Sequence, residues 1–179
     1  GIVAPSQEIY RALQRASQDK PVVVSMASVA ASGGYYIACG ADKIVANPGT
    51  ITGSIGVKAE IPNIKELMQK IGVDKKTIVS GELKDAGSMT KSLTPKEKKY
   101  FQNLVNDLFS QFKEVVVQNR DLSKKQINEF VDGRAITGRR AKELGLVDVL
   151  GGMYTAKQEL KKMCDLKGKI NFSRGPKEE

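Results

Sequence analysis

The sequence predicts a layered α/β fold. Short apolar runs of strand length alternate along the chain with segments in which apolar residues recur at helical spacing. The chain has 179 residues, of which 40% are hydrophobic and 27% charged. This length is enough to bury a hydrophobic core, and we expect residues 1–179 to form a single domain.

Helices and strands alternate from the start of the chain. A helix is expected over 7–16, just after a proline that suits a first helical turn, and a buried strand follows over 21–24. Ser32 comes after a turn of small residues. A short helix over 34–40 ends at a glycine, and a second strand is expected over 43–46.

The rest of the chain is richer in helical patterns. A capping box formed by Thr94 and Glu97 opens a long helix, whose apolar face continues to Val115. The polar end of the chain, 173–179, is expected to be disordered. The other helices are expected over 64–71, 123–130, 137–144 and 152–164, and the other strands over 76–79 and 146–148.

Composition narrows the classes of partner. The net charge is +9, but the lysines are spread along the chain and there is no tryptophan, so we expect a basic surface near an anionic membrane face and no nucleic-acid partner. No apolar run reaches the roughly 20 residues that cross a bilayer. Cys39 and Cys164 have no metal-ligand spacing; they are either one disulfide or two free thiols.

Ser32 is a candidate nucleophile. It lies among the smallest side chains, in the run Ala-Ala-Ser-Gly-Gly, and Gly33 after it lets a substrate approach the backbone closely. The chain contains no histidine, which excludes a Ser-His-Asp triad and leaves a lysine, a carboxylate or a terminal amine as the base. The alternative is a tight turn in which the serine only caps a helix.

Lys84 is the lysine that stands out as a base. It follows the strand expected over 76–79 and lies between two glycines. A lysine acts as a base only as a neutral amine, which burial favours, and Asp85 would oppose this unless it points to the opposite side of an extended chain. An ordinary surface lysine is the alternative. Ser54 either hydrogen-bonds such an amine or is a turn serine between two glycines.

Three segments together resemble one known family. They are VSMASVAASGGYYIACGADKIVANPGTITGSIGV at 24–57, SGELKDAGS at 80–88 and DGRAITGRRAKELGLVD at 132–148. The chain resembles the signal peptide peptidase A (SppA) family, membrane-associated serine-lysine peptidases of the ClpP/crotonase superfamily. The resemblance implies a fold of repeated β-β-α units with layered sheets and flanking helices.

The resemblance also implies roles for single residues. Ser32 matches the family's nucleophile, Lys84 its general base, and Ser54 the serine that orients the lysine. The Gly33 amide is one oxyanion donor. Gly1 matches the last glycine of the proline-glycine-glycine turn that supplies the other. Since the family's upstream strands and N-terminal membrane anchor precede that turn, we expect this chain to be a catalytic domain truncated at its N-terminus.

Substrates and partners follow from the same resemblance. It implies cleaved signal peptides and other apolar peptides as substrates, a groove containing Ile51, Ile55 and Val57, no cofactor or metal, and a ring-shaped homo-oligomer. The implied location is the bacterial cytoplasmic membrane, with the catalytic domain on its extracytoplasmic side. Two other functions stay open: a crotonase-type acyl-CoA enzyme, and a ring-forming assembly protein without catalytic activity.

Overall fold

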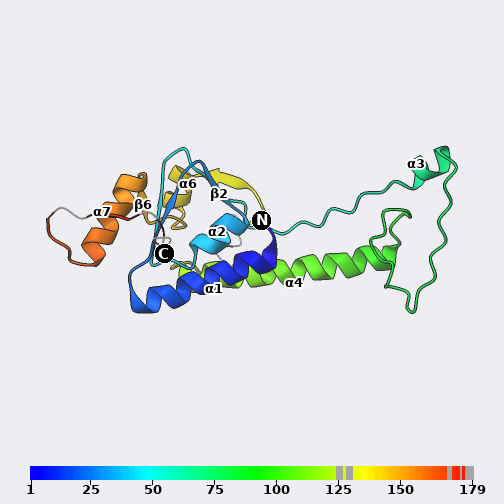
Figure 1. Cartoon of the computed structure of the whole chain (residues 1–179), viewed down its shortest axis with the longest axis horizontal. Helices are drawn as coiled ribbons and strands as arrows, with labels where there is room; N and C mark the ends of the chain where they lie inside the picture. The colour runs from blue at the N-terminus through cyan, green and yellow to red at the C-terminus, as the bar shows by residue number, and fades with distance from the viewer. Residues whose placement is uncertain (124–126, 128–130, 169–170, 174, 176–179) are drawn as a thin grey trace. The chain divides into compact units, whose positions relative to one another are not determined.

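A computed structural model describes residues 1–123, 127, 131–168, 171–173 and 175. Most of the helix expected over 123–130 and most of the tail expected over 173–179 lie outside these residues. The chain forms two compact units, Gly1–Gly56 with Phe112–Glu179 and Val57–Gln111. Helices and strands alternate along the chain, which confirms the predicted α/β class (Figure 1).

The first unit contains two small sheets. One has the order β1-β3-β6, with β1 and β6 each parallel to β3, and the other has the order β2-β4-β5, with β2 parallel and β5 antiparallel to β4. The first four strands enter the two sheets alternately, so β1, β2 and α2 form one β-β-α unit of the expected kind. The strands are β1 (Val23–Met26), β2 (Val29–Ala31), β3 (Lys43–Ala46), β4 (Ile51–Gly53), β5 (Ala135–Thr137) and β6 (Val149–Leu150).

Helices flank these sheets, and α1 packs along α2 (Figure 1). The first unit contains α1 (Val3–Asp19), α2 (Gly33–Ala38), α6 (Gly138–Glu143) and α7 (Met153–Met163). The second unit contains α3 (Lys65–Lys70) and most of α4 (Pro95–Asn119), whose last turns from Phe112 onward belong to the first unit. The helices expected at 7–16, 34–40, 64–71, 137–144 and 152–164 are thereby confirmed, with ends shifted by a few residues.

The core of the first unit is built on the first sheet and on aromatic contacts between helices. Tyr36 of α2 packs against Tyr10 of α1 and Phe112 of α4, with ring centroids 5.4 and 5.0 Å apart. Tyr35 is fully buried and its hydroxyl donates to the carbonyl oxygen of Leu146 at 2.9 Å. These contacts hold α2, and therefore the residue that precedes it, in a fixed position against α1.

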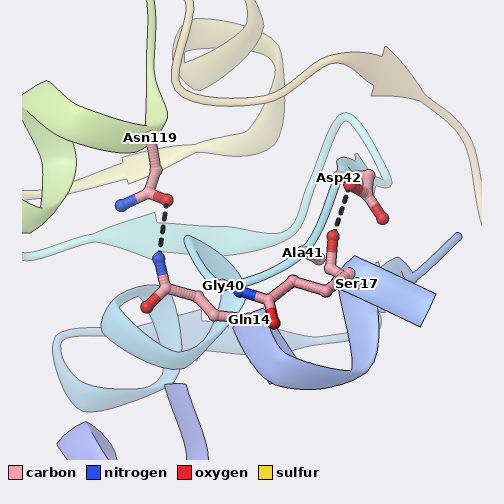
Figure 2. Close-up of a pocket in the computed structure, with 7 residues that line it drawn as sticks. Gln14, Ser17, Gly40, Ala41, Asp42 and Asn119 are labelled. Carbon is pink, nitrogen blue, oxygen red and sulfur yellow. Dashed lines mark hydrogen bonds between the residues drawn. The ribbon is translucent and has the colours of Figure 1, made fainter. Parts of the chain in front are cut away.

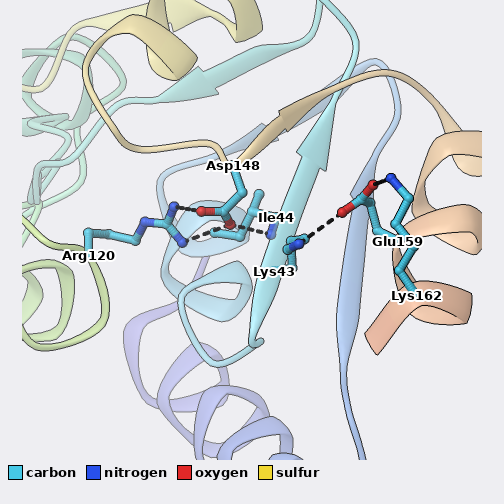
Figure 3. Close-up of polar contacts among 6 residues, drawn as sticks. All are labelled: Lys43, Ile44, Arg120, Asp148, Glu159 and Lys162. Atoms are coloured by element: carbon cyan, nitrogen blue, oxygen red, sulfur yellow. Dashed lines mark hydrogen bonds and ion pairs between the residues drawn. The ribbon is translucent and has the colours of Figure 1, made fainter. Parts of the chain in front are cut away.

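Two charged clusters fasten the start of β3, one to the residue before β6 and one to α7 (Figure 3). The Arg120 guanidinium donates to both carboxylate oxygens of Asp148, at 2.5 and 3.1 Å, and one of those oxygens accepts from the Ile44 amide at 2.6 Å. Lys162 and Lys43 donate to the Glu159 carboxylate, and these hydrogen bonds lower the pKa of Glu159 to about 2. Both carboxylates join a strand to a helical segment.

The long helix α4 begins as predicted. The Thr94 amide donates to the Glu97 carboxylate at 2.9 Å, and the Glu97 amide donates to the Thr94 hydroxyl at 3.2 Å, which together form the capping box. Its expected apolar face is only partly covered: Phe112 and Val115 are buried, whereas Leu104 is 46% exposed.

The strand expected over 76–79 is wrong, because the structure has no strand there and Ile78 is fully exposed. A run with β-propensity forms a strand only where another strand pairs with it, and none of the described residues does so here. The strand expected over 146–148 begins three residues later, as β6, and Val29–Ala31 forms a strand where a turn was expected.

Two other expectations are answered by the structure. Cys39 is buried and Cys164 is exposed, and both are free thiols. Among the described helices, none has both the length and the apolar character that a membrane span requires.

We expect Asp148→Asn to destabilise the protein by about 2 kcal/mol, because it leaves the buried Arg120 guanidinium without its carboxylate. The cost stays below that of a fully buried pair since the Asp148 side chain is 30% exposed. Urea unfolding measures it. The control is Glu143→Gln, which breaks the exposed Arg140–Glu143 pair and should cost less than about 0.5 kcal/mol. Equal effects of the two substitutions would contradict this role of Asp148.

Candidate active site

Ser32 occupies the junction between β2 and α2 in a strained backbone conformation. Its φ is 53° and its ψ is −120°, a region that non-glycine residues enter at a cost of roughly 1–3 kcal/mol. Its amide donates to the Gly53 carbonyl oxygen at 2.8 Å, and its own carbonyl oxygen accepts from the Tyr36 amide at 2.9 Å. Although Ser32 is the N-cap residue of α2, its hydroxyl makes no capping hydrogen bond. The capping alternative therefore does not describe this serine.

Ser54 lies next to Ser32 at the same end of the second sheet. The parallel pairing of β2 with β4 ends at Ala31 and Gly53, so the two serines follow directly on neighbouring strands. Ser54 also has a positive φ, 48°, and its amide donates to the Arg134 carbonyl oxygen at 2.9 Å. In the part of the chain that the structure describes, three non-glycine residues have a positive φ, and two of them are these serines. Such strain gathers at functional sites.

Gly1 and Gly33 lie against each other beside Ser32. A Cβ atom on Gly33 would stand 3.1 Å from the Gly1 Cα and 2.6 Å from the Ser6 hydroxyl oxygen, so a larger residue at position 33 would force Ser6 or the Gly1 backbone to shift. Gly33 is the first residue of α2, where an amide has no partner within the helix. The two glycines expected to hold an oxyanion are therefore neighbours in space.

Ser6 is a residue of this site that the sequence did not point to. It is 5% exposed, and its hydroxyl donates to the Ile2 carbonyl oxygen at 2.8 Å while its oxygen faces Gly33. It thereby fixes the chain at Gly1 and Ile2. A serine in the first turn of a helix is common, so only its burial against α2 sets it apart.

The three residues expected to line a groove differ in burial and in the unit to which they belong. Ile51 on β4 is 40% exposed and is paired in register with Val29, which is 68% exposed. Ile55 is buried in the first unit, and Val57 is a half-buried residue of the second. Ile51 and Val29 together form an exposed apolar surface that leads along the sheet to Ser32.

Lys84 belongs to the second unit. It lies in a series of turns rather than after a strand, with its amide donating to the Gly81 carbonyl oxygen at 3.0 Å, and it is exposed. Both nearby carboxylates have lysine partners: Glu82 pairs with Lys96, and Asp85 lies 3.4 Å from the Lys91 ammonium. The first unit thus brings together Ser32, Ser54, Gly33 and Gly1, while the pairing of Lys84 with Ser32 stays a prediction.

A polar pocket of about 270 Å³ lies elsewhere in the first unit, between α1 and the end of α4 (Figure 2). The Asp42 carboxylate at its rim accepts from the Ser17 hydroxyl at 2.5 Å and from the Val22 amide at 2.7 Å, so it fastens the segments before β1 and β3. None of the predicted site residues lines it. The pocket is lined by Gln14, Ser17, Gln18, Gly40, Ala41, Asp42 and Asn119.

Comparison with known sequences identifies a peptidase family that matches most of the chain. Residues 14–167 match the family described as Peptidase family S49, a span that contains Ser32, Ser54 and Lys84. The chain is 46% identical over 158 residues to a candidate protease from Synechocystis sp., covering 88% of this chain and 57% of that protein. It is 38% identical to a candidate signal peptide peptidase SppA from Enterococcus faecium, covering 90% of this chain and 47% of that protein.

More distant relatives and a solved structure extend the comparison. The chain is 37% identical to Protease 4 of Salmonella typhi, covering 90% of this chain and 26% of that protein. It spans about half the length of several curated relatives that it matches. The crystal structure of an enoyl-CoA hydratase from Mycobacterium smegmatis aligns with a TM-score of 0.46 at 15% identity, covering 90% of this chain and 44% of the other.

The strain at Ser32 predicts an order of stability for two variants that both lack the hydroxyl. Ser32→Gly should be more stable than Ser32→Ala by about 1 kcal/mol. Glycine adopts this φ freely while alanine keeps the strain, and the larger entropy that glycine loses on folding offsets part of the gain. Thermal unfolding of the two purified variants measures the difference. An alanine variant as stable as the glycine variant would show that the backbone at Ser32 is not strained.

Proposed function

This chain belongs to peptidase family S49, and we infer from that membership and from its site that it is a serine peptidase in which Ser32 is the nucleophile and Lys84 the general base. The observation that carries the proposal is the Ser32 hydroxyl, which is left free of capping at a strained strand-to-helix junction beside Gly33. A nucleophile held in such a turn projects its oxygen outward, while the first helical amide faces the same space.

The chemistry needs four groups. The neutral amine of Lys84 takes the proton of the Ser32 hydroxyl as its oxygen attacks the peptide carbonyl carbon. The carbonyl oxygen becomes an oxyanion that accepts from the Gly33 amide and from an amide near Gly1. As the carbon–nitrogen bond breaks, the Lys84 ammonium returns its proton to the leaving amine. Losing one oxyanion donor typically costs roughly 3–4 kcal/mol of transition-state stabilisation.

The acyl-enzyme is then hydrolysed by the same groups. Lys84 takes a proton from water, whose oxygen attacks the ester carbon, and the ammonium returns that proton to the Ser32 oxygen as the acid product leaves. Ser54 adjoins Ser32 at the end of the sheet, and its hydroxyl is the group that we propose orients the lysine amine. The chain contains no histidine, and Lys84 is the base in both steps of the proposed reaction.

The sheet beside Ser32 suits an extended apolar peptide as substrate. Within the described part of the chain, β2 is an edge strand of the β2-β4-β5 sheet, and it runs directly into Ser32. A peptide that pairs with this edge would bring a carbonyl group toward the nucleophile. The exposed side chains of Val29 and Ile51 favour apolar residues in that peptide. Cleaved signal peptides are substrates of this kind.

The second unit supports the proposal of a homo-oligomer. All of its residues are described, and the one buried among them is Glu97, a carboxylate. Apolar side chains such as Ile78, Tyr100 and Leu104 are exposed. A segment of this size with no apolar core is not expected to be stable alone. We propose that further copies of the chain cover this surface in a ring.

We also propose that the protein acts at the bacterial cytoplasmic membrane, on its extracytoplasmic side, and is held there by a membrane anchor. The net charge of +9 would favour contact with anionic lipid headgroups. Fractionation of cells that produce the full-length protein tests this, and recovery in the cytoplasmic fraction would contradict it.

A fluorophosphonate should label Ser32 of the full-length protein, and Lys84→Ala should slow the labelling at least about a hundredfold, because the hydroxyl then lacks its base. Intact-mass spectrometry measures the rate. The matched control is Lys76→Ala, an exposed lysine of the same unit, which should be labelled at the wild-type rate. Cleavage of a fluorogenic apolar peptide should follow the same order, and the same peptide with acidic residues should be cleaved more slowly.

Two results would contradict this proposal. One is labelling that persists in Ser32→Ala, which would place the nucleophile elsewhere. The other is a Lys84→Ala variant that is folded by circular dichroism and is labelled at the wild-type rate.

For the assembly, Leu104→Glu should reduce the sedimentation mass toward that of one chain, because it puts a charge on the exposed apolar face of α4. Gln102→Glu adds the same charge at an exposed polar position of the same helix and should leave the mass unchanged. A wild-type protein that sediments as a monomer would contradict the proposed ring.

A further inference from the structure

Both carboxylates that flank Lys84 in the sequence are occupied by other lysines. Glu82 pairs with Lys96 in the first turn of α4, and the Asp85 carboxylate lies 3.4 Å from the Lys91 ammonium. The two pairs differ in their surroundings: Glu82 and Lys96 are well exposed to water, whereas the Asp85 side chain is only 22% exposed. The Asp85 pair is therefore the less screened of the two.

Lys91 is held in place by the start of α4. Its ammonium lies 2.7 Å from one Glu97 carboxylate oxygen, and the other oxygen of Glu97 accepts from the Thr94 amide at 2.9 Å. Glu97 is thus both the capping residue of α4 and the anchor of Lys91. The hydrogen bond between them lowers the pKa of Glu97 and raises the pKa of Lys91, so both groups stay charged at neutral pH.

This arrangement bears on the residue beside Asp85. An unpaired carboxylate within reach of a lysine stabilises the ammonium form and so opposes its use as a base. Asp85 follows Lys84 in a run of turns, in which neighbouring side chains are not forced to opposite faces as they are in a strand. When the Lys91 ammonium pairs with the Asp85 carboxylate, that carboxylate no longer stabilises the ammonium form of Lys84.

We propose that Lys91, anchored by Glu97, is a positioning residue that holds the Asp85 carboxylate away from Lys84 and so leaves the Lys84 amine free to act as a base. The importance of this arrangement for catalysis rests on the proposed function, but the effect of Lys91 on Asp85 does not. The charged groups of the second unit that surround it are Glu82, Lys91, Lys96 and Glu97, and of these only Lys91 is paired with Asp85.

The direct test measures the protonation of Lys84 without relying on catalysis. The full-length protein is exposed to trace amounts of an acetylating reagent at a series of pH values, and mass spectrometry gives the extent of acetylation at each lysine. The midpoint pH for Lys84 should rise by about one unit in Lys91→Met, since Asp85 is then free to pair with Lys84. In Lys91→Met/Asp85→Asn it should return to the wild-type value.

Two further variants serve as controls. Lys98→Met removes one positive charge from an exposed position of α4 and should leave the midpoint unchanged. Asp85→Asn alone should also leave it unchanged, because the proposal has Asp85 already committed to Lys91. This second variant keeps the proposal testable if Lys91→Met fails to fold, since a midpoint that falls by about one unit in Asp85→Asn would overturn the proposal.

The remaining outcomes are equally decisive. An unchanged midpoint in folded Lys91→Met, or a double variant that stays as displaced as Lys91→Met, would overturn the proposal. In Lys91→Met, the pH below which kcat/KM for peptide cleavage declines should rise together with the acetylation midpoint of Lys84. At a fixed pH in that acidic range, kcat/KM should be about tenfold lower than in the wild-type protein. If the wild-type protein is not labelled at Ser32 while the acetylation pattern holds, the proposed function fails and the positioning role of Lys91 stands.

Discussion

The parallel pairing of β2 with β4 is the constraint on which the site depends. It ends at Ala31 and Gly53, and the hydrogen bond from the Ser32 amide to the Gly53 carbonyl oxygen continues it by one step. The chain must then leave the sheet and start α2 at once, which forces Ser32 into a positive φ. The contacts of Tyr36 with Tyr10 and Phe112 hold α2 in place directly after this turn, and so maintain the strain at Ser32.

The same pairing explains why small residues surround Ser32, the proposed nucleophile. Because α2 starts immediately after the strand, Gly33 comes within contact distance of Gly1 and Ser6 on the neighbouring segment, and a side chain there would force these neighbours to shift. The buried Ser6 hydroxyl ties down the Ile2 carbonyl group, so the backbone at Gly1 is also fixed. The site is thus made of backbone positions more than of side chains, which suits the oxyanion-binding role proposed for it.

Much of the secondary structure follows from local sequence. The helical spacing of apolar residues gives α1 and α7, the capping box gives the start of α4, and β3 appears where its apolar run predicts. Partners distant in sequence decide the rest. The run at 76–79 has strand propensity but, in the part of the chain that the structure describes, no strand beside it, while the alanine-rich β2 has little propensity and is a strand because β4 pairs with it.

The candidate site, too, could be predicted from local sequence only in part. Ser32, Ser54 and Gly33 could be selected from motifs, but the burial of Ser6 against Gly33 and the Lys91–Asp85 pair are contacts that no local pattern encodes. The central claim is that Ser32 and Lys84 act together, and a crystal structure of the full-length protein with a peptide boronic acid tests it most directly. We expect boron bonded to the Ser32 oxygen, a boronate oxygen accepting from the Gly33 amide, and the Lys84 amine within hydrogen-bond reach of the Ser32 oxygen. Boron on another residue, or a Lys84 amine beyond that reach, would contradict it.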